Sequence, residues 1–151
     1  MKTLVKTLVG LGALLLFLLL VVSFSLKLAF EPERTEVLRV ASPSGDAVAI
    51  LYETNGGATT SFGYKVEIAG RDLIPTQQEV ASIYGAIRNN RGAYGVMPRW
   101  VSDDELHIEY YSSRDDRVIP EVGRKTGKPI QVRLKLNIND LSAPPGGMAR
   151  P

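Results

Sequence analysis

The chain has 151 residues, no cysteine and a single histidine, so disulfide bonds and a lipidated cysteine are excluded and a zinc site is implausible. Its formal net charge of +2 is misleading, because Lys2, Lys6 and Lys27 precede residue 31 whereas all 16 acidic residues follow residue 30. Residues 31–151 are therefore nearly neutral, which argues against nucleic acid as a partner.

The N-terminal stretch Thr7–Leu26 contains no charged residue. In a helix that rises about 1.5 Å per residue, such a stretch matches a hydrocarbon core of about 30 Å. Lys2 and Lys6 precede the stretch and glutamates follow it, which predicts a cytoplasmic N-terminus. We expect a cytoplasmic segment 1–6, a single transmembrane anchor at 7–30 in the inner membrane, and a C-terminal domain outside the cytoplasm.

A cleaved signal peptide is the alternative interpretation of this stretch. Ser23 and Ser25 have the small side chains that a cleavage site needs, so cleavage after Ser25 is conceivable. The apolar run continues through Leu26, Leu28 and Phe30, beyond such a site. This continuation favours an anchor that is not cleaved.

Alternation of apolar and polar residues predicts a small β domain over residues 31–141. The alternation is clearest in Ile130–Ile138, where it places Leu134 and Leu136 in the core and Arg133 and Lys135 outside. Ala47–Tyr52 is apolar on both faces and predicts a central strand. Further strands are expected at 38–40, 64–68, 94–101, 106–110 and 118–122. The last segment, 142–151, is rich in proline and glycine, and we expect it to be disordered.

The segment 76–88 carries conflicting signals. Thr76 and Glu79 have the spacing of a helix capping box, and the apolar residues that follow have helical spacing. Gly85 lies in the middle of this segment, where it disfavours a helix by about 1 kcal/mol relative to alanine. From these residues alone, a helix and a strand both remain open.

Three elements together resemble a group of small uncharacterised bacterial proteins that commonly carry a hydrophobic N-terminus. They are the turn Ser42-Pro43-Ser44-Gly45, the Gly-Ala-Thr-Thr sequence within Asn55–Thr60, and Trp100 followed by the alternating stretch Leu106–Tyr110. The resemblance covers about residues 38–112 and implies no activity. It implies that Val80–Arg88 is an extended strand.

The Gly56–Thr60 loop is the main candidate binding element. Gly56 and Gly57 expose backbone N–H groups, and Thr59 and Thr60 add hydroxyls, a combination that suits an anion or a sugar hydroxyl. The alternative is a hairpin connection whose threonines satisfy its own backbone.

Arg99 and Trp100 form a second candidate. Together they suit a stacking platform for a ligand, and the alternative for Trp100 is a place in the core.

Charge is segregated near the C-terminus. Residues 102–116 are acidic and residues 117–139 are basic. We expect these segments to neutralise one another across neighbouring strands. A basic strip for an acidic partner or anionic lipid is the alternative.

The residue types that carry catalysis have no matching pattern here, so we predict no catalytic residue, metal or cofactor. His107 lies on the alternate face of a strand, Asp103–Glu105 lacks the spacing of a calcium loop, and no serine lies in a Gly-x-Ser-x-Gly elbow,.

The predicted fold is mostly β, with a small antiparallel sheet or sandwich domain behind one N-terminal transmembrane helix. The predicted function is that of a membrane-anchored envelope protein whose β domain binds another protein. A module that binds a cell-wall or anionic small ligand through Gly56–Thr60 is the alternative, and a hydrolase comes third.

Overall fold

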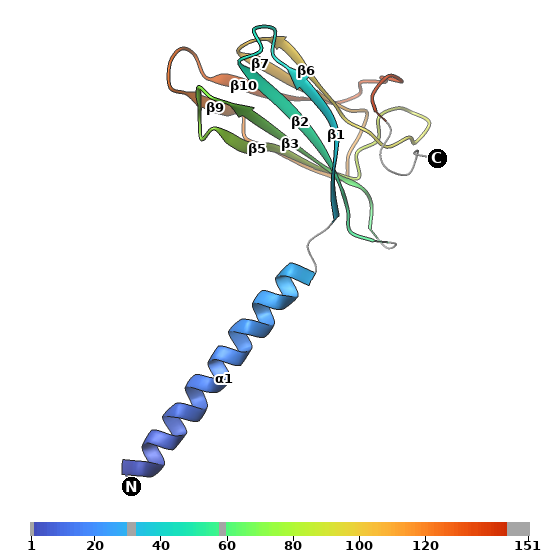
Figure 1. Cartoon of the computed structure of the whole chain (residues 1–151). Helices are drawn as coiled ribbons and strands as arrows, with labels where there is room; N and C mark the ends of the chain where they lie inside the picture. The colour runs from blue at the N-terminus through green and yellow to red at the C-terminus, as the bar shows by residue number, and fades with distance from the viewer. Residues whose placement is uncertain (1, 30–32, 58–59, 145–151) are drawn as a thin grey trace. The chain divides into compact units, whose positions relative to one another are not determined.

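The computed structural model describes residues 2–29, 33–57 and 60–144. The chain divides into two units, Met1–Pro32 and Glu33–Pro151. The first contains the helix α1 (Lys2–Ala29) (Figure 1). Its described side chains are almost all aliphatic or aromatic, and Leu14, Phe17 and Phe24 are exposed. Over the part of the chain that the structure describes, no helix proves long and apolar enough to cross a membrane.

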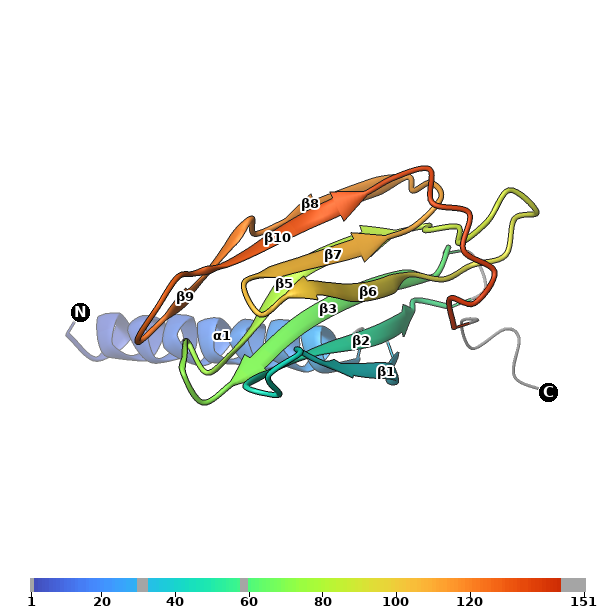
Figure 2. The same cartoon turned by 90° about the horizontal axis from the view of Figure 1, so that it is seen from above.

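The second unit contains two five-stranded sheets (Figures 1 and 2). The first sheet has the order β1-β2-β3-β5-β8, and every neighbouring pair is antiparallel. Its strands are β1 (Glu33–Ala41), β2 (Ala47–Asn55), β3 (Gly63–Gly70), β5 (Gln77–Tyr84) and β8 (Asp115–Val118).

The second sheet has the order β4-β9-β10-β7-β6. Its strands are β4 (Leu73–Ile74), β9 (Glu121–Arg124), β10 (Ile130–Lys135), β7 (Glu105–Glu109) and β6 (Met97–Ser102). The pairs are antiparallel except β10–β7, which is parallel. This one pair departs from the antiparallel arrangement that the sequence predicts.

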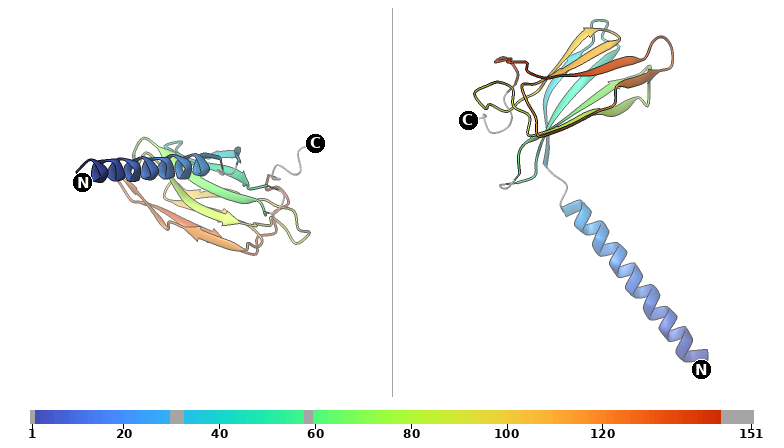
Figure 3. Two further views of the ribbon diagram at one scale, coloured as in Figure 1. Left: turned by 90° about the horizontal axis from the view of Figure 1, so that it is seen from below. Right: turned by 180° about the vertical axis from the view of Figure 1, so that it is seen from behind.

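The two sheets lie as two layers around one core (Figures 2 and 3). The first sheet contributes Leu51 and Val66, and the second contributes Leu106, Ile108 and Ile130, all of which are buried. Apolar residues at alternate positions of β3, β7 and β10 are buried in this core, as a half-buried strand requires. The prediction of a small mostly-β domain is confirmed.

The ambiguous segment is a strand over Gln77–Tyr84, which agrees with the extended strand expected from Val80 onward. The expected continuation to Arg88 is wrong, because Gly85 has a φ of 65° and Ile87 forms only isolated bridges. β5 pairs with β3, and Ile83 lies opposite Tyr64. The residues that indicate a helix cap have other partners: the Thr76 carbonyl accepts a hydrogen bond from Gly70 N at 2.9 Å, and Glu79 pairs with Lys65 at 2.8 Å. Cross-strand contacts therefore override the local helix signal.

The expected strand at Val118–Val122 is wrong. The chain instead leaves the first sheet after Val118 and enters the second at Glu121. Ile119 N donates to Val80 O in the first sheet, whereas Pro120 O accepts from Val132 N in the second. Two adjacent residues thus bond to different layers, which a single strand would not allow.

The last predicted strand is too long at its C-terminal end. β10 ends at Lys135, and Asn137 has a φ of 64°, which turns the chain. Arg133 is exposed as expected and Leu134 is partly buried, but Leu136 is 50% exposed. The prediction that Leu136 lies in the core is therefore wrong.

The expected disorder of 142–151 is wrong for its first residues. Ala143 is buried, and its carbonyl accepts a hydrogen bond from Arg88 Nη1 at 2.6 Å. Residues 145–151 lie outside the described residues.

Candidate functional site

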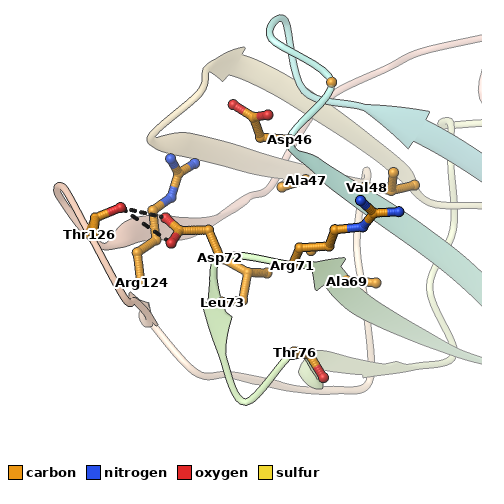
Figure 4. A pocket seen from close by; sticks show the side chains of 12 residues that line it. Asp46, Ala47, Val48, Ala69, Arg71, Asp72, Leu73, Thr76, Arg124 and Thr126 are labelled. Carbon is orange, nitrogen blue, oxygen red and sulfur yellow. Dashed lines mark hydrogen bonds between the residues drawn. The ribbon is translucent and has the colours of Figure 1, made fainter.

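Three turns meet at one end of the sandwich and enclose a cleft of about 850 Å³ (Figure 4). They are the β1–β2 turn with Gly45 and Asp46, the β3–β4 turn with Arg71 and Asp72, and the end of β9 with its following turn, which supplies Arg124 and Thr126. This volume lies within the range of about 300–1,000 Å³ that small-molecule sites occupy.

The residues that line the cleft include the small residues Ala47, Ala69 and Gly70. A β-carbon on Gly70 would lie 2.8 Å from the Asp46 carbonyl oxygen and 3.1 Å from Leu73. Only glycine lets the two turns approach this closely, so Gly70 sets the shape of the cleft.

Arg124 forms one wall of the cleft. Its Nη2 donates to the Asp103 carbonyl at 2.5 Å, and its Nη1 lies 3.8 Å from an Asp104 carboxylate oxygen. Its Nε is buried and has no hydrogen-bond partner among the described residues. A buried unpaired donor costs about 1–3 kcal/mol, so this guanidinium is held in place by its two terminal nitrogens alone.

Two further bonds tie the walls together. Ser44 N donates to Asp103 Oδ1 at 2.8 Å, and this bond holds the pKa of Asp103 below its ordinary range. Thr126 Oγ1 lies 3.3 Å from both carboxylate oxygens of Asp72. The turns that surround the cleft are therefore linked by side-chain hydrogen bonds as well as by the sheets.

The predicted Gly56–Thr60 loop lies at the opposite end of β2, after Asn55. Asn55 Oδ1 accepts a hydrogen bond from Gly57 N at 2.9 Å, and Thr60 Oγ1 donates to Gly57 O at 3.0 Å. A β-carbon on Gly56 would lie 2.9 Å from Thr60 Oγ1. The Thr60 hydroxyl is thus used within the loop, whereas Thr59 lies outside the described residues.

Arg99 and Trp100 lie on β6, at the edge of the second sheet. Arg99 is exposed and pairs with Glu109 at 3.1 Å and Asp140 at 3.3 Å. Trp100 is partly buried against the core, and its Nε1 donates to Val40 O at 3.0 Å.

The structure does not bring the two predicted sites together. Trp100 bonds to Val40, which lies opposite Ala49 near the start of β2. The glycine loop follows Asn55 at the other end of the same strand. At about 3.3 Å per residue, the length of β2 separates them.

The acidic and basic segments pair with one another, as expected. β7 lies beside β10, and Glu105 lies 3.2 Å from Arg133. Arg124 and Arg117 lie near Asp104 and Asp115 respectively. His107 is partly buried, with its Nε2 2.9 Å from Glu105 Oε1. The hydrogen bond to His107, together with Arg133, holds the pKa of Glu105 below its ordinary range.

Sequence reasoning missed the cleft, although the first of its turns, at Ser42–Gly45, was recognised. Asp46, Arg71 and Arg124 are far apart in the chain, and only the strand order brings them to one end. No protein-family model, curated protein or solved structure matches this chain.

Proposed function

We propose that this protein is a single-pass, membrane-anchored envelope protein whose β domain binds another protein by adding an extended segment of that partner to the edge of β1. The observation that carries this proposal is the length and composition of that edge. A terminal strand presents a row of unpaired backbone N–H and C=O groups, and extended peptides bind proteins by pairing with them.

β1 is the most suitable of the sheet edges in the described part of the chain. It has nine residues and no proline. The other edge strands are β8 with four residues, β4 with two, and β6 with six. β6 also contains Pro98, which has no N–H to donate to a neighbouring strand.

The backbone direction of β1 shows where a partner would bond. Ser42 N donates to Ala47 O in β2. Because hydrogen-bonding direction alternates along a strand, Val40 also points toward β2, whereas the N–H of Arg39 points to the free side.

Side chains on β1 give this edge selectivity. Arg34 pairs with Glu67 and lies over the Tyr52 ring at 3.5 Å, and Arg39 bonds to Glu36 at 2.8 and 2.9 Å. A β-bulge interrupts the register between Glu36 and Leu38. Charges and a bulge on an edge oppose unselective pairing with other chains, so the partner we propose is a different protein whose extended segment carries matching charges.

The membrane part of the proposal is supported by the sequence. Thr7–Leu26 is uncharged and follows Lys2 and Lys6, and α1 extends over this stretch. A reporter fused after Pro151 should be active only outside the cytoplasm. Activity of that reporter inside the cell would reject the proposed topology.

The binding part is tested by photo-crosslinking in membranes of the full chain. A photoreactive amino acid at Thr35 in β1 should capture a discrete protein, whereas the same group at Arg117 in β8 should not. Arg39→Pro removes the outward N–H and should abolish the Thr35 crosslink. Arg39→Ala, the matched control, loses the same side chain but keeps the N–H, so the Thr35 crosslink should remain. Equal capture by both variants, at unchanged thermal midpoints, would reject strand addition at β1.

A further inference from the structure

We infer that the cleft at the Ser42–Asp46 end binds a zwitterionic amino acid or short peptide with small apolar side chains, with its carboxylate on Arg71 and its ammonium group on Asp46. This site is separate from the proposed β1 edge, since neither Arg71 nor Asp46 belongs to β1. Figure 4 shows both side chains at the cleft, extending from different turns.

Two of the four charged side chains at the cleft, those of Asp46 and Arg71, are free to take a ligand. In the described part of the chain, the Asp46 carboxylate and the Arg71 guanidinium have no hydrogen-bond or ion-pair partner. By contrast, Arg34, Lys65 and Arg99 are each ion-paired on the outer surfaces of the sheets. The cleft thus presents an unpaired cation and an unpaired anion.

The balance of charge indicates a ligand with both signs. The charged lining consists of Asp46, Asp72, Arg71 and Arg124, so it is formally neutral. A simple anion would meet two carboxylates and a simple cation would meet two guanidinium groups, and like charges at a site cost binding free energy. A zwitterion presents the complementary charge to each.

The apolar part of the lining sets the size of the side chain. Ala47, Val48, Ala69 and Leu73 form it, and small aliphatic groups fit against such side chains. The twelve lining residues include no aromatic ring. A sugar would lack the ring on which sugars commonly stack, whereas an alanyl side chain needs none.

The walls of the cleft are held in place by hydrogen bonds and an ion pair. Thr126 bonds to Asp72, and Arg124 bonds to Asp103 and Asp104. These groups are held before a ligand arrives, so little order is lost on binding. Arg71 and Asp46 are left as the adjustable contacts at the rim.

The test is calorimetric titration of the full chain in detergent with dialanine, and with two blocked forms that each lack one charge. N-acetyl-dialanine has no ammonium group, and dialanine amide has no carboxylate. Each blocked form should bind about tenfold more weakly or worse than dialanine, the effect of losing a charge-assisted hydrogen bond.

The variants assign each charge to its residue. Arg71→Gln should weaken dialanine binding by about tenfold but leave binding of the amide unchanged. Asp46→Asn should also weaken dialanine binding by about tenfold but leave binding of N-acetyl-dialanine unchanged. Arg117→Gln, an exposed arginine on β8, is the matched control and should alter neither. Thermal midpoints would verify that each variant is folded.

Two results would overturn the inference. One is the absence of saturable binding of dialanine at millimolar concentration to the folded wild-type chain. The other is an equal effect of Arg71→Gln on dialanine and its amide, because the carboxylate would then not be the group that Arg71 contacts. No Thr35 crosslink in the wild-type chain, or equal capture by Arg39→Pro and Arg39→Ala, would reject the β1 proposal alone if dialanine still binds.

Discussion

The indole Nε1 of Trp100 donates a hydrogen bond to the carbonyl oxygen of Val40 at 3.0 Å. Val40 lies in β1, an edge strand of the first sheet, and Trp100 lies in β6, an edge strand of the second. This bond therefore joins the two sheets along one side of the sandwich. Because the ring is also partly buried against the core, Trp100 fixes the position of the edge to which we assign binding.

Replacing Trp100 with phenylalanine should destabilise the domain. The change removes the donor to Val40 and part of the packed ring, and it should lower the free energy of unfolding by about 1–3 kcal/mol. Val101→Ala on the same strand is the control, since Val101 is 53% exposed and should change stability by about 0.5 kcal/mol or less. Urea unfolding measures both. Equal effects would show that the inter-sheet bond contributes nothing.

Glu67 should make the domain sensitive to acid. Burial alone would raise the pKa of this carboxyl, but hydrogen bonds from Gln77 and Arg34 hold the pKa of Glu67 below its ordinary value of 4.5. Near this pH the unfolded chain binds a proton that the folded chain does not. The contribution of Glu67 to stability is therefore fully present above pH 4.5. It is lost as the pH falls from 4.5 through the pKa of Glu67 in the folded state,.

The corresponding measurement is the thermal midpoint of the full chain and of Glu67→Gln between neutral pH and strong acid. The variant lacks the titrating group, so its midpoint should fall less steeply with decreasing pH below about 4.5. Glu79→Gln is the control on the same face, because Glu79 pairs with Lys65 and is more exposed. If Glu67→Gln and the wild type lost stability in parallel, another carboxyl would be responsible.

Sequence patterns predicted the parts of the fold in which local composition is sufficient. Ala47–Tyr52 is apolar on both faces and lies inside β2, the second strand of its sheet. The chain crossing at Ile119–Pro120 escaped prediction because hydrogen bonds to Val80 and Val132, in different sheets, decide it. The cleft could not be predicted for a related reason, since no local sequence pattern shows that three distant turns converge.

Two aliphatic residues that look equivalent in the sequence, Ile130 at the start of β10 and Leu136 just after its end, allow a direct comparison. Ile130 is fully buried, whereas Leu136 is 50% exposed just beyond the strand. Ile130→Ala should cost about 2–5 kcal/mol through lost burial and a cavity. Leu136→Ala should cost about 0.5 kcal/mol or less. Comparable losses in denaturant unfolding would place Leu136 in the core after all.

The C-terminal segment Ser142–Pro144 should depend on Gly95. Gly95 has a φ of 153°, and a β-carbon there would lie 2.7 Å from the Pro144 carbonyl oxygen and 3.1 Å from Arg88 side-chain atoms. An alanine at this position must displace the segment or Arg88. Either movement breaks the bond of 2.6 Å from Arg88 Nη1 to Ala143 O.

Gly92→Ala separates this contact from backbone strain. Gly92 also has a positive φ, 83°, but a β-carbon there would meet no atom within 4 Å. Gly92→Ala should therefore lower the free energy of unfolding only through backbone strain, by about 1–2 kcal/mol. Gly95→Ala should cost about 1–3 kcal/mol more, because it also leaves buried polar groups without partners, and it should raise amide hydrogen exchange at Ala143. Equal costs and unchanged hydrogen exchange at Ala143 would mean that the C-terminal segment is held without Arg88.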